Sequence, residues 1–125
     1  MAINRDRREQ EVEFDDYSVT LLVHSPDGPR LDEAEAAAMQ DRHMGHIADL
    51  ADLGQLVAAG PVFDETYRGL SILTVSPQEA LELSAADPAV RAGIYRVEVL
   101  PWRLPAGAMT FSPARFPRSV AEALA

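Results

Sequence analysis

The chain has 125 residues, of which 47% are hydrophobic and 25% are charged, a balance typical of one globular domain with one hydrophobic core. It contains no cysteine, which excludes disulfides, thiolate zinc sites and cysteine nucleophiles. Its net charge of −9 disfavours nucleic-acid binding, and no apolar run is long enough to span a membrane. Because the first residues lack the apolar segment of a signal peptide, we expect a cytoplasmic protein.

Taken in chain order, hydrophobic patterning and turn residues predict one domain over residues 17–103 between two flanking segments. A polar arm precedes it over residues 1–16, and we expect a tail over residues 104–125 to pack on the domain or on a dimer partner. Within the domain the predicted elements are a strand at 17–24, a loop at 25–30, a helix at 31–53, strands at 55–62 and 69–75, a helix at 76–88 and a strand at 94–102. The segment SVAEALA predicts a short helix at the end of the tail.

The second predicted helix has recognisable boundary residues. Ser76 suits the N-cap, and Pro77 suits the first helical position. The Asp87-Pro88 step is predicted to end this helix, because a residue before proline disfavours the helical conformation. Asp87 would then lie at a helix C-terminus, where the helix dipole disfavours an anion. Its carboxylate would need another partner, such as a histidine.

The element order β-α-β-β-α-β predicts an α+β, ferredoxin-like fold, with two helices on one face of a four-stranded antiparallel sheet. The strands carry apolar residues on both faces, including Leu70, Ile72, Val97 and Val99. One helical layer covers only one of these faces, and an apolar face left exposed usually indicates a partner. We therefore expect a homodimer packed sheet against sheet, with neither nucleic-acid nor membrane partners.

Two histidines lie on the apolar side of the first predicted helix. His43 and His46 are about 60° apart around the helix axis, on the side that also carries Leu50 and Leu53. In one interpretation both rings are half-buried and hydrogen-bonded without a further role. In another, one ring is a catalytic base, which needs an acid to orient it and a cavity to admit a substrate. Helical spacing alone leaves both interpretations open.

A metal site is a third interpretation of the histidine pair. A third ligand would come from Asp49 or His24. Against a metal site, the spacing of the two histidines differs from that of a zinc-protease helix. With three histidines and no thiolate in the chain, we expect no metal. The sequence also lacks a phosphate-binding glycine loop, a serine elbow and a pair of catalytic carboxylates. We therefore expect no cofactor.

Two segments together resemble the YCII-related family of small proteins with a dimeric ferredoxin-like α/β-barrel fold. The first is HIADLADLGQLVAAGP, in which a histidine, apolar residues, a glycine and an apolar strand lead to Gly-Pro. The second is DPAVRAGIYRVEVLPW, in which Asp-Pro and a glycine precede an apolar strand that closes with Pro-Trp. The resemblance covers about residues 17–102 and is carried by the order and spacing of these pieces.

The resemblance implies an active site built from a His-Asp pair, with His46 at the family's histidine position and Asp87 at its acid position. It also implies a homodimer whose sheets face each other. Activities known or proposed in the family include dehydrochlorination of a chlorinated hydroxyhydroquinone. His43 lies one turn before the family histidine, which leaves open which imidazole faces the cavity.

The mechanism expected from this pair is general acid–base chemistry. Asp87 would accept a hydrogen bond from one nitrogen of His46, and the other nitrogen would take a proton from a phenolic or enol-like substrate. Elimination, isomerisation and proton transfer all fit such a pair. The alternative is a non-catalytic small-ligand-binding or accessory homodimer, and a purely structural dimer would lack a ligand-sized cavity. The candidate substrate-binding residues are Arg42, His43, Gly60, Pro61 and Ser71, and Tyr95 is a further polar candidate.

Overall fold

The structure is a computed structural model that describes residues 12–125, so most of the predicted arm, residues 1–11, lies outside the described residues. Its elements are β1 (Phe14–His24), α2 (Glu33–Asp52), β2 (Leu56–Pro61), β3 (Tyr67–Leu73), α3 (Pro77–Ala85), α4 (Pro88–Arg91), β4 (Tyr95–Pro105) and α5 (Val120–Leu124). Among these helices, none combines the length and the apolar composition that crossing a membrane requires.

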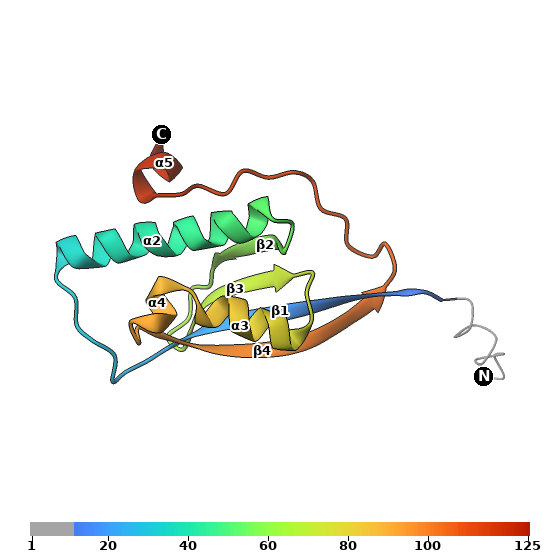
Figure 1. Ribbon diagram of the computed structural model, residues 1–125, viewed down its shortest axis with the longest axis horizontal. Helices are drawn as coiled ribbons and strands as arrows, with labels where there is room; N and C mark the ends of the chain where they lie inside the picture. The colour runs from blue at the N-terminus through green and yellow to red at the C-terminus, as the bar shows by residue number, and fades with distance from the viewer. Residues whose placement is uncertain (1–11) are drawn as a thin grey trace.

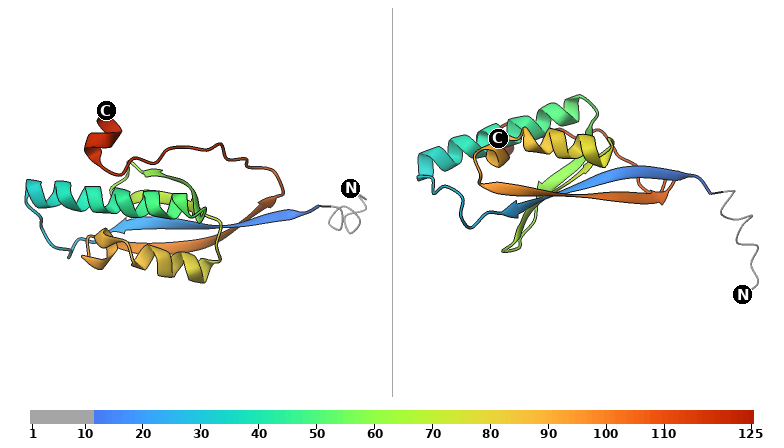
Figure 2. Two further views of the ribbon diagram at one scale, coloured as in Figure 1. Left: turned by 45° about the horizontal axis from the view of Figure 1, so that its top comes forward. Right: turned by 60° about the horizontal axis from the view of Figure 1, so that its bottom comes forward.

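The four strands form one antiparallel sheet in the order β2-β3-β1-β4. The two central strands, β3 and β1, are thus paired on both sides, and β2 and β4 form the two edges. Helices α2, α3 and α4 lie on one face of the sheet, as the two views of Figure 2 and the view of Figure 1 show. The predicted α+β, ferredoxin-like fold is therefore confirmed.

Local sequence signals account for where the two longer helices begin. Asp32 and Glu35 form a reciprocal capping box at the start of α2, with the Glu35 backbone N–H donating to Asp32 Oδ1 over 2.7 Å. Ser76 accepts from the backbone N–H of Glu79 at the start of α3, and Pro77 takes the first helical position, as predicted. Gly54 follows α2 with a φ of 73°, a conformation that glycine adopts without steric cost.

The second predicted helix is two helices, which corrects the prediction for 76–88. Helix α3 ends at Ala85, and Asp87 is the N-cap of the short helix α4. The Asp87 Oδ1 atom accepts a hydrogen bond of 2.9 Å from the backbone N–H of Ala89. Asp87-Pro88 is therefore a helix start of the same kind as Ser76-Pro77, in which proline after a capping residue begins a helix. The Asp87 carboxylate therefore lies at the N-terminus of α4, where the helix dipole is positive, and not, as predicted, at a helix C-terminus.

Strands β1 and β4 are longer than predicted. They pair from His24 and Tyr95 as far as Phe14 and Pro105, so the end of the predicted polar arm belongs to the sheet. The extension is seen in the backbone pairing of residues 14–16 with residues 103–105. The side chains of these two segments are too polar to predict a strand from the sequence alone.

The two faces of the sheet differ in what covers them. On the helix-covered face, the buried core cluster consists of Leu50, Leu56, Leu73 and Ala80. Strand residues of opposite orientation leave apolar side chains exposed on the other face: Leu100 and Trp102, which pair with Val19 and Tyr17 of β1, are 53% and 41% exposed. No described helix covers this second face (Figure 2).

The C-terminal tail runs from the end of β4 back across the domain to α2 (Figure 1). It is attached first beside the start of β1, where the backbone N–H of Ala106 donates to the carbonyl of Glu13, the residue before β1, over 2.8 Å. Its end is attached to α2, where the N–H of Val120 donates to Asp41 Oδ1 over 2.9 Å. The tail therefore packs on its own domain, and the predicted last helix is α5.

Candidate active site

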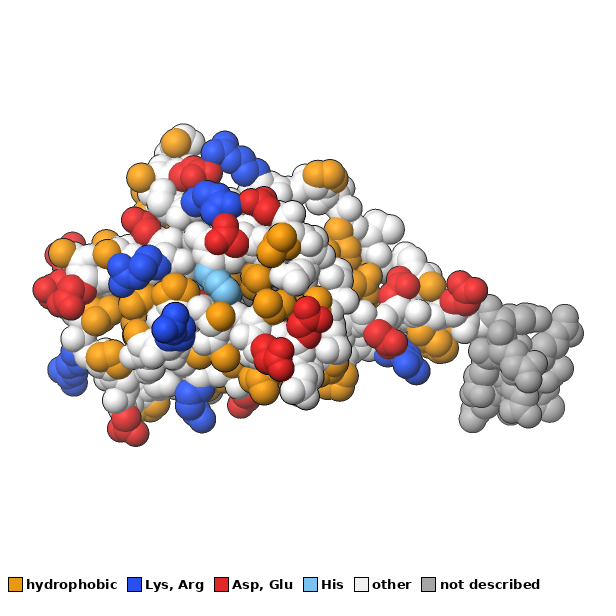
Figure 3. All heavy atoms as spheres, in the orientation of Figure 1, with side chains coloured by type: hydrophobic (Ala, Val, Ile, Leu, Met, Phe, Trp, Pro, Cys, Tyr) orange, Lys and Arg blue, Asp and Glu red, His pale blue; other side chains and the backbone are white. Residues whose placement is uncertain are grey.

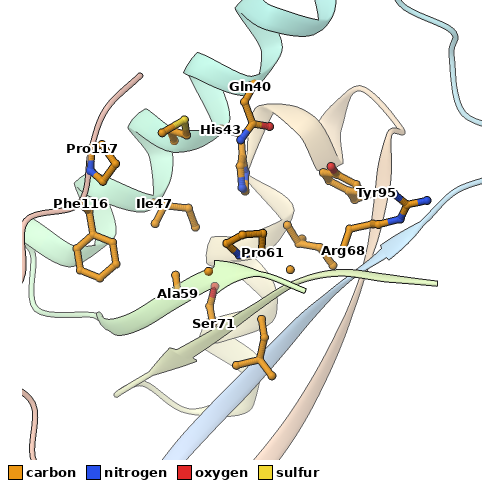
Figure 4. Close-up of a pocket in the computed structure, with 15 residues that line it drawn as sticks. Gln40, His43, Ile47, Ala59, Pro61, Arg68, Ser71, Tyr95, Phe116 and Pro117 are labelled. Atoms are coloured by element: carbon orange, nitrogen blue, oxygen red, sulfur yellow. The ribbon is translucent and has the colours of Figure 1, made fainter. Parts of the chain in front are cut away.

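A cavity of about 370 Å³ lies on the helix-covered side of the sheet, bounded by α2, the β2-β3 hairpin, the start of β4 and the tail. Figure 4 shows side chains from all of these segments converging on one space. Most of its lining is apolar, with a few polar groups. The lining residues are Leu22, Gln40, His43, Met44, Ile47, Ala59, Gly60, Pro61, Arg68, Gly69, Leu70, Ser71, Tyr95, Phe116 and Pro117.

His43 connects this cavity to the buried acid. Its Nδ1 atom lies 2.6 Å from Asp87 Oδ2, and the same ring lines the cavity. The side chain of His43 is 17% exposed, whereas that of Asp87 is 3% exposed. The buried carboxylate accepts two hydrogen bonds, one from His43 Nδ1 and one from the backbone N–H of Ala89. Helix α4 packs against α2, which brings the cap of α4 to this turn of α2.

The expected pairing of His46 with Asp87 is wrong. His46 Nε2 lies 2.9 Å from the backbone carbonyl oxygen of Leu83, in the last turn of α3, and His46 does not line the cavity. The last carbonyls of a helix have no partner within the helix, and a histidine side chain can satisfy one of them. One turn of α2 thus separates an imidazole that binds a helix N-cap from an imidazole that binds a helix C-terminus.

The two partners fix different tautomers for the two neutral rings. A backbone carbonyl only accepts hydrogen bonds, so His46 must carry its proton on Nε2 to donate to Leu83. An ionised carboxylate also only accepts, so neutral His43 carries its proton on Nδ1 to donate to Asp87. The Nε2 atom of His43 then has a free lone pair, and no described residue is hydrogen-bonded to it. Of these two rings, His43 is the one that lines the cavity and directs an unprotonated nitrogen to it.

The predicted substrate-binding residues divide into two groups. His43, Gly60, Pro61 and Ser71 all line the cavity. Arg42 does not, and its exposed guanidinium contacts Met39 Sδ at 3.9 Å on the outside of α2. Residues 42 and 43 are adjacent on a helix and point about 100° apart, so both seldom reach one cavity.

A glycine at a strand end can be required for a positive φ or for the close approach of another group, and neither reason applies to Gly60. Its φ is not positive, and a Cβ atom built on it would have no neighbour within 4 Å. Pro61 agrees with the position of β2 at the edge of the sheet, where a missing N–H costs no ladder hydrogen bond.

Sequence reasoning missed several lining residues, of which Gln40, Arg68 and Phe116 carry the most chemistry. Gln40 lies one turn before His43, so the helical period was the available signal. Arg68 pairs its Nε with the carbonyl of Glu65 over 3.2 Å, and nothing local marks it as a cavity residue. Tyr95, a polar candidate from the sequence, does line the cavity, with its ring 6.4 Å from the His43 ring in an edge-on arrangement.

The cavity has a polar and an apolar end. In Figure 4, Arg68 and Tyr95 lie on one side of His43, and Phe116 and Pro117 lie on the other. The face drawn in Figure 3 shows histidine atoms at its centre, surrounded by hydrophobic side chains. Within residues 12–125, no group of three or more histidine, aspartate or glutamate side chains is arranged to hold a metal ion.

Comparison with known protein families matches residues 19–103 to the YCII-related domain. This match begins within β1 and ends within β4, and it includes His43, His46 and Asp87 but not the tail. None of the curated proteins compared with the chain matches it.

Proposed function

The chain belongs to the YCII-related family, and from this premise we propose that His43 and Asp87 together perform general acid–base chemistry on a small phenolic or enol-like molecule. The observation that carries the proposal is the 2.6 Å contact between His43 Nδ1 and Asp87 Oδ2, made by a ring that also lines a cavity. A base needs both features, an acid that orients it and access to a substrate.

Each member of the pair has a defined role. Asp87 holds the His43 ring in the tautomer with Nδ1 protonated, and it places negative charge beside the imidazolium that forms when Nε2 takes a proton. His43 Nε2 removes a proton from a substrate hydroxyl or activated C–H and returns it later in the reaction. Such general-base help contributes about 10²–10⁴-fold in rate. Elimination, isomerisation and simple proton transfer all require this step.

The other lining residues support a small aromatic or enolic ligand. Arg68 is the only lining side chain with a fixed positive charge, and it suits an oxygen that gains negative charge when its proton leaves. Ser71 and Tyr95 add hydroxyl groups, and the apolar remainder of the lining suits the faces of a flat ring. A volume of about 370 Å³ restricts the ligand to a small molecule.

The test compares His43→Gln with His46→Gln, a matched pair on one helix. Each purified variant is incubated in deuterated water with resorcinol, catechol and hydroxyhydroquinone, and ring-hydrogen exchange is followed by proton NMR. We expect exchange catalysed by the parent protein, lost by about 10²–10⁴-fold in His43→Gln and retained in His46→Gln. Equal rates in the parent and His43→Gln would contradict the proposal. Phenol binding that depends on pH without any catalysed exchange would instead support the ligand-binding alternative.

We also propose that two copies of the chain pack through their uncovered sheet faces. Leu100 and Trp102 support this, because these two large apolar side chains remain exposed on one face. Sedimentation of the parent chain should give a dimer, and Leu100→Glu should give a folded monomer. A monomeric parent chain would contradict this arrangement.

A further inference from the structure

The apolar end of the cavity is built by the tail, outside residues 19–103 that match the family. Phe116 and Pro117 supply this wall. Figure 4 shows them across the cavity from Tyr95, with the His43 ring between the two ends. A ligand whose oxygen lies between His43 and Arg68 would therefore point its other end toward Phe116.

Two sets of contacts hold Phe116 in place. Its ring packs against the hydrophobic core cluster. Two residues later, the guanidinium of Arg118 binds two carboxylates of α2, with Nη1 2.8 Å from Asp49 Oδ1 and Nη2 2.6 Å from Asp52 Oδ2. Figure 3 shows acidic and basic side chains interleaved where α5 lies over α2. The tail is thus fastened to the same helix that carries His43.

Resting on the proposed function, we propose that Phe116 determines how long a ligand the cavity accepts. The substrate class is then a phenol or enol that carries its hydroxyl at His43 and a short apolar substituent directed at Phe116. Arg118 is a positioning residue, since it touches α2 and not the cavity. The family-matched domain supplies the acid–base pair, and the tail of this chain supplies the size limit.

Two substitutions of Phe116 should change the length of the cavity in opposite directions. Phe116→Ala removes the wall and lengthens the cavity, whereas Phe116→Trp shortens it. The probes are phenol and para-phenylphenol, whose difference is one apolar ring, and their dissociation constants are measured by calorimetry on the full chain. We expect Phe116→Ala to shift the preference toward para-phenylphenol by about tenfold or more. Phe116→Trp should shift it the other way while phenol still binds.

Two tail arginines provide a positioning variant and its control. Arg118→Ala removes both ion pairs between the tail and α2. It should shift the preference between phenol and para-phenylphenol in the same direction as Phe116→Ala, by only about threefold, because exposed ion pairs are weak. Arg115 binds Glu122 inside the tail at 2.6 Å and makes no ion pair with α2 among the described residues. Arg115→Ala should therefore leave the preference unchanged.

An unchanged preference in both Phe116 variants would overturn the inference, and so would failure of Phe116→Ala to bind para-phenylphenol. Melting temperatures near that of the parent chain show that each variant is folded. Failure of the proposed function is a separate result, because His43→Gln would then leave catalysed exchange intact while the size preference still followed Phe116.

Discussion

His43 and His46 are the same residue type on the same helix, one turn apart, and yet they do different things. His43 binds the N-cap carboxylate of α4, whereas His46 binds a carbonyl at the C-terminus of α3. These two helix ends follow one another in the chain, between Leu83 and Asp87. Either acceptor leaves the second ring nitrogen with a lone pair, but only the His43 ring lines the cavity, and only its partner is a carboxylate. The difference shows that the partner and the access to the cavity, and not the residue type, distinguish the two histidines.

The largest effect expected for this pair of histidines comes from Asp87→Asn. Asparagine is as good an N-cap as aspartate, so α4 keeps its cap and the fold is retained. The amide lacks the charge and can donate to Nδ1 of His43, which favours the wrong tautomer. Turnover should fall by about 10²–10⁴-fold with little change in melting temperature.

The matched control is Asp32→Asn, which makes the same change at the N-cap of α2, where no histidine binds the carboxylate. Turnover equal to that of the parent chain is expected there. A similar loss of turnover in both variants would show that capping, and not the contact with His43, is what matters.

A smaller effect, on stability alone, is expected for His46→Leu. The change leaves the carbonyl of Leu83 without its partner, and an unsatisfied, partly buried carbonyl costs about 1–3 kcal/mol in free energy of unfolding. Urea unfolding measures this loss, and turnover at a temperature where the variant is folded should match that of the parent. Loss of turnover in the folded variant would show that His46 is also needed for turnover, against the different roles given to the two histidines.

The smallest effect concerns the pH dependence of stability and the carboxylate of Asp32, the N-cap of α2. The backbone N–H of Glu35 holds the pKa of the Asp32 carboxyl below its ordinary value of 3.8. The folded state therefore binds this proton less readily than the unfolded state does. The resulting stability is fully present above the unfolded pKa and is lost as pH falls through the lowered folded pKa.

Unfolding of the parent chain and of Asp32→Asn across this acid range measures that contribution. The variant should show a shallower loss of stability on acidification, with an unchanged pH profile of turnover. A change in the turnover profile would mean that Asp32 is coupled to the site and that it is no independent control for Asp87.

The sequence predicted the fold well because its signals are local and mutually consistent. Ser76-Pro77 marked a helix start, and apolar patterning marked the four strands, whose order along the chain relative to the helices α2 and α3 is confirmed. The same reasoning failed at Asp87-Pro88, although its pattern of a capping residue before proline matches Ser76-Pro77. An Asp-Pro step both ends one helix and begins another, and only the observed cap shows that the second reading holds.

The candidate site was predicted only in part. Helical spacing identified His43 and His46 as neighbours, and the family resemblance identified Asp87, but neither determines which ring meets the acid. That depends on how α4 packs against α2, a tertiary contact that no local pattern contains. Phe116 was missed for a related reason, since the path of the tail across the domain brings it to the cavity.

Nitrogen-detected NMR of the two imidazoles tests the central claim most directly, because it reports which ring nitrogen carries the proton. In the neutral rings, we predict the proton on Nδ1 of His43 and on Nε2 of His46. Addition of phenol should then shift the Nε2 resonance of His43 and leave both nitrogens of His46 unmoved. A proton on Nε2 of neutral His43, or a response to phenol at His46 alone, would contradict the account.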